Sequence, residues 1–192
     1  MKKAGSFSCF FIFFSTMLCA QKWYVSGAGS NDKDGKSLAT AFRTLQKAAD
    51  LVKPGDVVLV GNGLYTNVDQ TNGSAVLKIH ASGNADSWIT WKAIKGETPI
   101  VNPRGWAGIQ VTGSYNIIDG FHVIGNNDSI YLLEAQEDAK KSTPNPYFNS
   151  NDICFEGRNM PADKKPHHLV IRNCEVSKCA GGAADPMAGM KM

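Results

Sequence analysis

Short apolar runs separated by Gly, Asn, Asp and Pro make up most of the chain after residue 55. These runs are rich in β-branched residues and too short for helices, so each is expected to form a β-strand. The expected strands are KWYVS at 22–26, DVVLV at 56–60, AVLKIH at 75–80, SWITWKAI at 87–94, PIV at 99–101, GIQVTG at 108–113, NIIDGFHVIG at 116–125, SIYLL at 129–133, DICFEG at 152–157 and HLVIRNCEV at 168–176. Many short strands with close turns predict an all-β fold.

One segment has a helical pattern instead. Within residues 40–53, the apolar residues Leu45, Ala48, Ala49 and Val52 recur at the spacing of one helical face. The Pro-Gly pair that follows residue 53 ends the helix. Residues 134–150 are polar and contain two prolines, so they are expected to be a loop that interrupts the strands.

The strand sequences echo one another. The run Ile117–Val123 (IIDGFHV) matches Val170–Val176 (VIRNCEV) at an offset of 53 residues, and residues 90–92 match 117–119 at an offset of 27. We interpret 27 residues as one turn of a solenoid and 53 as two. The Gly or Asn at the middle of each echo suits a sharp corner with left-handed backbone angles. This pattern predicts a single-stranded parallel β-helix, with an antiparallel sandwich as the alternative.

The 40–53 helix then acquires a structural role. A solenoid exposes an open strand edge and an apolar end at its first coil, and such edges promote aggregation. An amphipathic helix placed there would cover both. We therefore expect the helix to cap the N-terminal end of the β-helix.

Residues 1–20 have the plan of a signal peptide. Lys2 and Lys3 precede an apolar stretch that is shorter than the roughly 20 residues needed to span a bilayer, and the small residue Ala20 precedes Gln21. Cleavage is expected between Ala20 and Gln21, with export to the periplasm or the medium and no transmembrane segment in the mature chain. A lipoprotein signal that uses Cys19 and an uncleaved anchor are the alternatives.

Composition narrows the function classes. The chain has 192 residues and a formal net charge of +3, which falls to +1 without the signal, at 18 basic against 17 acidic residues. A nucleic-acid binder usually has a strongly basic surface, so this class is disfavoured. The mature chain keeps Cys154, Cys174 and Cys179, an odd number that allows at most one internal disulfide.

The opening of the mature chain resembles a known group. The segments WYVSGAGSNDKDGKS, AFRTLQKAADLVKPGDVVLVGNGLYT and WITWKAIKGETPIV are similar to the first coils of secreted right-handed parallel β-helix proteins. The resemblance extends over residues 22–180 and is strongest to pectate-lyase-like polysaccharide lyases of family nine. It implies a right-handed β-helix over residues 21–180.

The resemblance also implies a chemistry. Such lyases cleave uronate polymers such as pectate by β-elimination, with Ca²⁺ held by several Asp residues and a Lys or Arg as the base. The Asp cluster and the base of the family have no match here, because the acidic residues of this chain are scattered. The alternatives are a non-catalytic carbohydrate-binding or surface β-helix protein, and a glycoside hydrolase on the same fold, which would need paired carboxylates.

Three residues are weak candidates for binding an acidic polysaccharide. Asp119 and Arg172 occupy the same column of the echo, so their side chains should point the same way on different coils. Lys92 belongs to the same column through the second echo and could bind a uronate carboxylate. The spacing of His167 and His168 from the cysteines fits no closed zinc pattern. The ring systems that could stack on sugars are those of Trp23, Trp88, Trp91 and Trp106, of which at least two are expected to be buried.

Residues 181–192 have no strand pattern and follow a strand that should continue into another coil. We therefore expect an irregular tail on a truncated relative of the family. Because the catalytic coils of the lyases have no counterpart, the chain by itself is expected to be inactive and to aggregate through its open last coil.

Overall fold

The computed structural model describes residues 20–67, 71 and 73–180. The predicted signal peptide and the predicted tail therefore lie outside the described residues, apart from Ala20. The strands are β1 (Lys22–Val25), β2 (Val57–Val60), β3 (Gly63–Thr66), β4 (Ala75–Ile79), β5 (Ile89–Ala93), β6 (Pro99–Asn102), β7 (Ala107–Val111), β8 (Asn116–Asp119), β9 (His122–Ile124), β10 (Asn151–Phe155), β11 (Leu169–Arg172) and β12 (Glu175–Ser177). The helices are α1 (Leu45–Ala49), α2 (Leu132–Ala139) and the short 3-10 turns Leu38–Thr40, Asn127–Ser129, Pro146–Asn149 and Ala162–Lys164. None of the described helices is long and apolar enough to cross a membrane.

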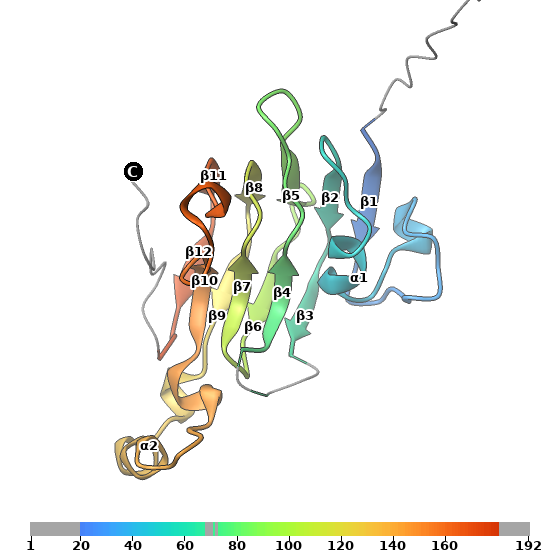
Figure 1. Cartoon of the computed structure of the whole chain (residues 1–192). Helices are drawn as coiled ribbons and strands as arrows, with labels where there is room; N and C mark the ends of the chain where they lie inside the picture. Colours follow the sequence, from blue (N-terminus) through green and yellow to red (C-terminus); the bar gives the residue numbers. More distant parts are fainter. Residues whose placement is uncertain (1–19, 68–70, 72, 181–192) are drawn as a thin grey trace, which may run out of the picture.

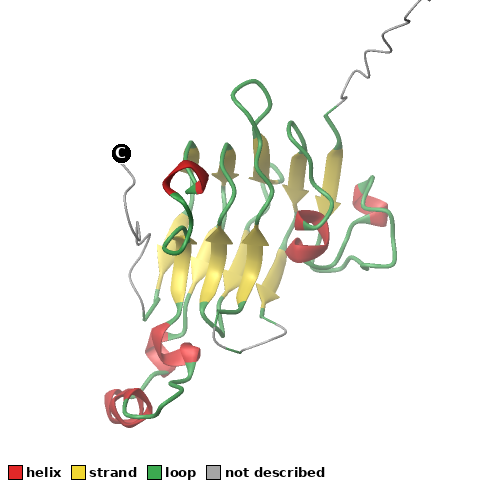
Figure 2. Cartoon of the chain, in the orientation of Figure 1, coloured by secondary structure: helices red, strands yellow, loops and turns green. Residues whose placement is uncertain are grey.

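The strands form three sheets that run along the molecule (Figures 1 and 2). Sheet A has the order β1-β2-β5-β8-β11, sheet B the order β12-β9-β6-β3, and sheet C the order β10-β7-β4. Every pair of neighbouring strands is parallel. The chain visits the three sheets in turn and then returns to the next position in each, which is a parallel β-helix. The antiparallel sandwich is therefore excluded.

The register confirms the sequence echoes and corrects one interpretation. Trp91 pairs with Ile118 and Lys92 with Asp119, so the offset of 27 is one coil, as predicted. Arg172 pairs directly with Asp119, so the offset of 53 is also one coil, not two. The extra length of this coil comes from the segments before and after β10, which lie outside the repeating strands.

The first of these segments contains a helix where a loop was expected. α2 occupies the start of the predicted loop, and the predicted strand over 129–133 is wrong (Figure 1). Leu132 and Leu133 are exposed rather than packed in a sheet, and the Glu, Gln and Ala residues that follow are strong helix formers. Asp138 closes the helix by accepting hydrogen bonds from Lys141 Nζ at 2.8 Å and from the backbone N–H of Asn145 at 2.6 Å.

The predicted corners have the expected geometry. The run 116–125 is two strands, β8 and β9, separated by Gly120 with φ of 85°. The run 168–176 is divided in the same way by Asn173 with φ of 53°. These are the left-handed angles that Gly adopts without steric cost and Asn tolerates. Each corner turns the chain from sheet A into sheet B within two residues.

The N-terminal helix is shorter than predicted. The α-helix covers 45–49 rather than 40–53 because Phe42 is drawn into a bridge with Val25 of β1, and Thr44 then caps the helix. The Gln46 side chain accepts from the backbone N–H of Lys78 at 2.9 Å and donates to its carbonyl at 3.4 Å. Because Lys78 lies on β4, the end strand of sheet C, this amide pairs with an edge that has no neighbouring strand there.

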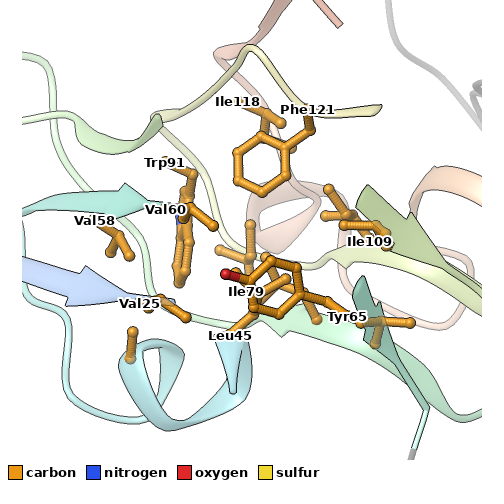
Figure 3. Packing of buried hydrophobic residues seen from close by; sticks show 14 of the residues in the cluster. Val25, Leu45, Val58, Val60, Tyr65, Ile79, Trp91, Ile109, Ile118 and Phe121 are labelled. Carbon is orange, nitrogen blue, oxygen red and sulfur yellow. The ribbon is translucent and has the colours of Figure 1, made fainter. Parts of the chain in front are cut away.

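The core fills the space between the three sheets (Figure 3). Its largest fully buried side chains include Trp91, Phe42 and Phe121, with aliphatic residues from every coil between them. Of the four Trp residues, Trp91 is fully buried and Trp23 is partly buried against the core, whereas Trp88 and Trp106 are half-buried outside it. Trp23 is partly buried, stacks on Phe42 and donates from Nε1 to Asp56 at 2.9 Å.

Candidate functional site

The structure brings the three predicted binding residues together on the outer side of sheet A. Lys92 on β5, Asp119 on β8 and Arg172 on β11 are successive partners in the register. Arg172 Nε donates to Asp119 Oδ2 at 3.1 Å, and Lys92 Nζ lies 3.8 Å from the same oxygen. Asn173 Nδ2 donates to the other oxygen, Oδ1, at 2.8 Å. The echo in the sequence therefore predicted a real cluster.

The electrostatics of this cluster leave it positive. Asp119 is buried, with its side chain 7% exposed, whereas those of Lys92 and Arg172 are 51% and 53% exposed. The hydrogen bond from Asn173 lowers the pKa of Asp119, and the hydrogen bond and positive charge of Arg172 lower it further. Burial acts in the opposite direction, but the net shift of the pKa is downward. The carboxylate is thus ionised at neutral pH, and two exposed cations share one buried anion.

A separate cleft of about 450 Å³ lies beside sheet C. Gly73 and two stretches of chain line it. One stretch contains Trp106, just before β7, and Gln110 on β7, and the other is residues 156–160, which follow β10. The pairing of β10 with β7 places these stretches side by side. The described lining residues are Gly73, Trp106, Gln110, Glu156, Gly157, Arg158, Asn159 and Met160.

Local backbone bonds hold the cleft's loop. The N–H of Glu156 donates to the Val111 carbonyl at 2.9 Å, and the N–H of Arg158 donates to Glu156 Oε1 at 3.1 Å. A Cβ on Gly157 would lie 2.9 Å from Pro166 Cδ, so this close approach requires glycine. The cleft is therefore lined by Trp106 and Gln110 on one side and by Glu156, Arg158 and Asn159 of this loop on the other. Aromatic walls with a few polar groups are typical of sites for small polar ligands such as sugars.

The comparisons with known proteins identify the family. Residues 23–181 match the model of the Pel9A-like, right-handed beta helix region. The chain belongs to this family. A search of curated proteins gave no match.

Solved structures show the same fold as this Pel9A-like β-helix. A rhamnogalacturonan lyase aligns with a TM-score of 0.53 and 19% identity over 86% of this chain and 43% of its own. The GH136 lacto-N-biosidase from Eubacterium ramulus aligns with a TM-score of 0.57 and 16% identity over 84% of this chain and 28% of its own. The pectate lyase Pel9A aligns with a TM-score of 0.46 and 23% identity over 54% of this chain and 28% of its own. The chain thus spans less than half the length of each of these structures. The family match and the likeness to the first two structures establish the right-handed β-helix.

The remaining sequence candidates lie apart from the cleft. Trp106, one of the four candidate stacking residues, lines it. Lys92, Asp119 and Arg172 lie on sheet A, whereas the cleft follows sheet C, so the predicted cluster and the cleft are two sites. Cys154 is buried on β10, and no disulfide links it to Cys174 or Cys179.

Sequence reasoning missed the loop residues of the cleft. Glu156, Arg158 and Asn159 stand 50 or more residues after Trp106, and only the pairing of β10 with β7 brings them together. The matching of Ile153 with Ile109 across that pair was the available signal, but the insertion before β10 hid the echo.

Asp152 is a second missed residue. It lies on β10 with no exposed surface, and neither carboxylate oxygen has a hydrogen-bond partner. Burial raises the pKa of Asp152 to about 7. The acid is therefore partly protonated at neutral pH beneath the sheet that carries the cleft.

Proposed function

We propose that this Pel9A-like chain forms the substrate-binding coils of an exported polysaccharide lyase that acts on uronate polymers, pectate first. Membership of the Pel9A-like family supports a carbohydrate-active β-helix. The observation that carries the uronate class is the cleft beside sheet C, which is lined by both Trp106 and Arg158.

The lining residues suit a chain of acidic sugars. A Trp ring packs against the apolar face of a pyranose, and a guanidinium binds a carboxylate through two parallel hydrogen bonds. Gln110 and Asn159 supply amide donors and acceptors for hydroxyl groups. The bond between the Arg158 N–H and Glu156 holds the loop in position before the substrate arrives.

In β-elimination, a base removes the proton on the carbon next to the uronate carboxylate. The C–O bond on the neighbouring carbon then breaks, a C=C double bond forms between these two carbons, and the released sugar oxygen takes up a proton to become a hydroxyl group. Within this cleft, the binding of the uronate carboxylate by Arg158 would withdraw electron density and acidify that proton. We assign no base among the described residues.

Calcium belongs to the proposal only through the family resemblance. Among the described residues, no group of three or more His, Cys, Asp or Glu side chains lies together, and Ca²⁺ prefers six to eight oxygen ligands. The described residues therefore do not form a calcium site on their own. A calcium requirement would need oxygens from elsewhere, including the carboxylates of the substrate.

Hydrolysis on the same fold is the competing reaction. A glycoside hydrolase uses two carboxyl groups separated by roughly 5–9.5 Å on either side of the bond. Among the described residues that line the cleft, Glu156 is the single carboxylate. This observation favours elimination or binding over hydrolysis.

The test is to incubate the purified chain with polygalacturonate, rhamnogalacturonan and a neutral galactan, with calcium or with a chelator. Affinity electrophoresis measures retention, ultraviolet absorbance measures unsaturated product, and a colorimetric assay measures new reducing ends. We expect retention by polygalacturonate that falls in Trp106→Ala and Arg158→Gln but not in the exposed control Lys53→Gln. Unsaturated product would place the catalytic groups within this chain. Reducing ends without that absorbance, or no retention by any uronate polymer, would overturn the proposal.

A further inference from the structure

Three aromatic side chains form a ladder on sheet A, one from each of three coils. Trp88, Tyr115 and His168 each precede the paired first residues of β5, β8 and β11. The Tyr115 and His168 rings stack at a centroid distance of 4.5 Å, and Trp88 meets Tyr115 edge to face at 5.4 Å. Trp88 and Tyr115 are half-buried and His168 is exposed, so the ladder lies at the surface rather than in the core.

The backbone is strained to hold two of these rings. Tyr115 has φ of 55° and His168 has φ of 54°. A left-handed conformation is unfavourable for a residue that carries a Cβ atom. Glycine would adopt these angles without steric cost, yet both positions carry a bulky ring. We infer that the rings contribute to the function of this surface.

The same sheet carries the positive cluster at the other end of its strands. Lys92 follows Trp88 by four residues on β5, which is about 13 Å along an extended strand. Because the buried Asp119 offsets only one of the two exposed cations, this end has an excess positive charge. The half-buried side chains of Thr90, Ile117 and Val170 form a flat strip between the ladder and the cations.

We propose that this outer face of sheet A is a second, non-catalytic binding surface for an acidic polysaccharide. The aromatic ladder would stack on the sugar rings, and Lys92 and Arg172 would pair with carboxylates further along the same chain. The excess positive charge selects a polyanion as the occupant, and the flat strip fits an extended chain better than a compact ligand. The inference takes its uronate class from the proposed function, but it concerns a sheet that the cleft does not use.

A second surface of this kind changes how long polymers bind. Two sites on one molecule that engage the same polymer raise its apparent affinity, because the second contact is intramolecular. Short oligomers cannot reach both sheets and gain nothing. The surface is thus expected to act on long chains.

The test compares charge-removing, charge-keeping and control variants of the full chain. Lys92→Gln/Arg172→Gln removes both cations, Lys92→Arg/Arg172→Lys keeps both, and Lys53→Gln/Lys140→Gln removes two exposed charges from other parts of the chain. Trp88→Ala removes the first ring of the ladder. Affinity electrophoresis in long polygalacturonate and in fully methyl-esterified galacturonan measures retention, and thermal melting confirms that each variant is folded.

We expect the charge-removing pair to weaken retention by polygalacturonate about tenfold, as the loss of two exposed ion pairs implies. The charge-keeping pair should restore it, the control pair should not change it, and added salt should weaken wild-type retention. Trp88→Ala should weaken retention in both polymers. Equal retention by the charge-removing and control pairs, with the Trp106→Ala effect intact, would overturn this inference and leave the proposed function standing. Loss of self-association in the charge-removing pair, with retention unchanged, would show instead that the face binds a second copy of the chain.

Discussion

Asp152 makes the folded chain less stable as the pH rises. Its carboxyl group is fully buried on β10 without a hydrogen-bond partner, and burial raises its pKa to about 7. In the unfolded chain an Asp has a pKa near 3.9. Below about pH 4 both states hold the proton and the group costs nothing through ionisation. Between about pH 4 and pH 7 the unfolded state releases the proton while the folded state keeps it, so stability is lost over this window.

The magnitude follows from the difference of about three pKa units. At 1.36 kcal/mol per unit, this group removes about 4 kcal/mol of stability between pH 4 and pH 8. Asp152→Asn has nearly the same shape but cannot ionise, so the contribution of this side chain to the free energy of unfolding no longer depends on pH. The variant should therefore become more stable relative to wild type by about 4 kcal/mol over that range.

Urea denaturation of both proteins at pH 4, 6 and 8 measures this difference. All other ionisable groups are the same in both proteins, so their contributions cancel. Asp163→Asn, at an exposed position of a 3-10 turn, is the control and should follow the wild-type profile. Parallel profiles for Asp152→Asn and wild type would refute the reasoning. They would mean that Asp152 ionises as readily in the folded state as in the unfolded state.

Three further substitutions test the features that hold the coils. Asp119→Asn should cost about 1.5–3 kcal/mol at neutral pH, because charge-assisted hydrogen bonds from two partners are weakened. Since the pKa of Asp119 is lowered, its stabilisation is present above about pH 4 and is lost as the pH falls through the folded pKa, which acid titration of unfolding detects. Gly120→Ala should cost about 1–2 kcal/mol by chemical denaturation, because the corner keeps φ at 85° and the new methyl would lie 3.0 Å from the Cβ of Ala93; an unchanged midpoint would contradict the strain. Trp91→Ala should lower the free energy of unfolding by about 3–5 kcal/mol, and a smaller loss would show that the core collapses around the cavity.

The repeating part of the fold could be predicted from the sequence. Strands that pair in a parallel β-helix have the same inward and outward pattern, so equivalent residues such as Lys92, Asp119 and Arg172 repeat along the chain. The corner residues were legible too, because Gly120 and Asn173 are among the few types that accept left-handed angles. The two echoes thus align the same residues that pair across β5, β8 and β11 of sheet A.

The segments before and after β10, which interrupt the repeats, could not be predicted in the same way. α2 buries no apolar residue against the coils, and its two exposed leucines, Leu132 and Leu133, continue a short apolar run that resembles a strand. The burial of Asp152 was also hidden, because a carboxylate beside apolar residues normally indicates the solvent side of a strand. The cleft forms because β10 pairs with β7, which places the residues after β10 beside Trp106 and Gln110. The segment inserted before β10 changes the repeat length, so this pairing could not be read from the sequence.

The site of polysaccharide contact is the central claim, and hydrogen–deuterium exchange measures it directly. The chain is compared with and without a galacturonate oligomer too short to reach both sheets. We predict that the oligomer slows exchange of the backbone amides of residues 156–160, which line the cleft, and of the segment 106–110, whose Trp106 and Gln110 line it. A neutral galactan oligomer of the same length should leave these amides unchanged. Unchanged exchange at both segments, with the galacturonate oligomer demonstrably bound, would contradict the assignment of the cleft.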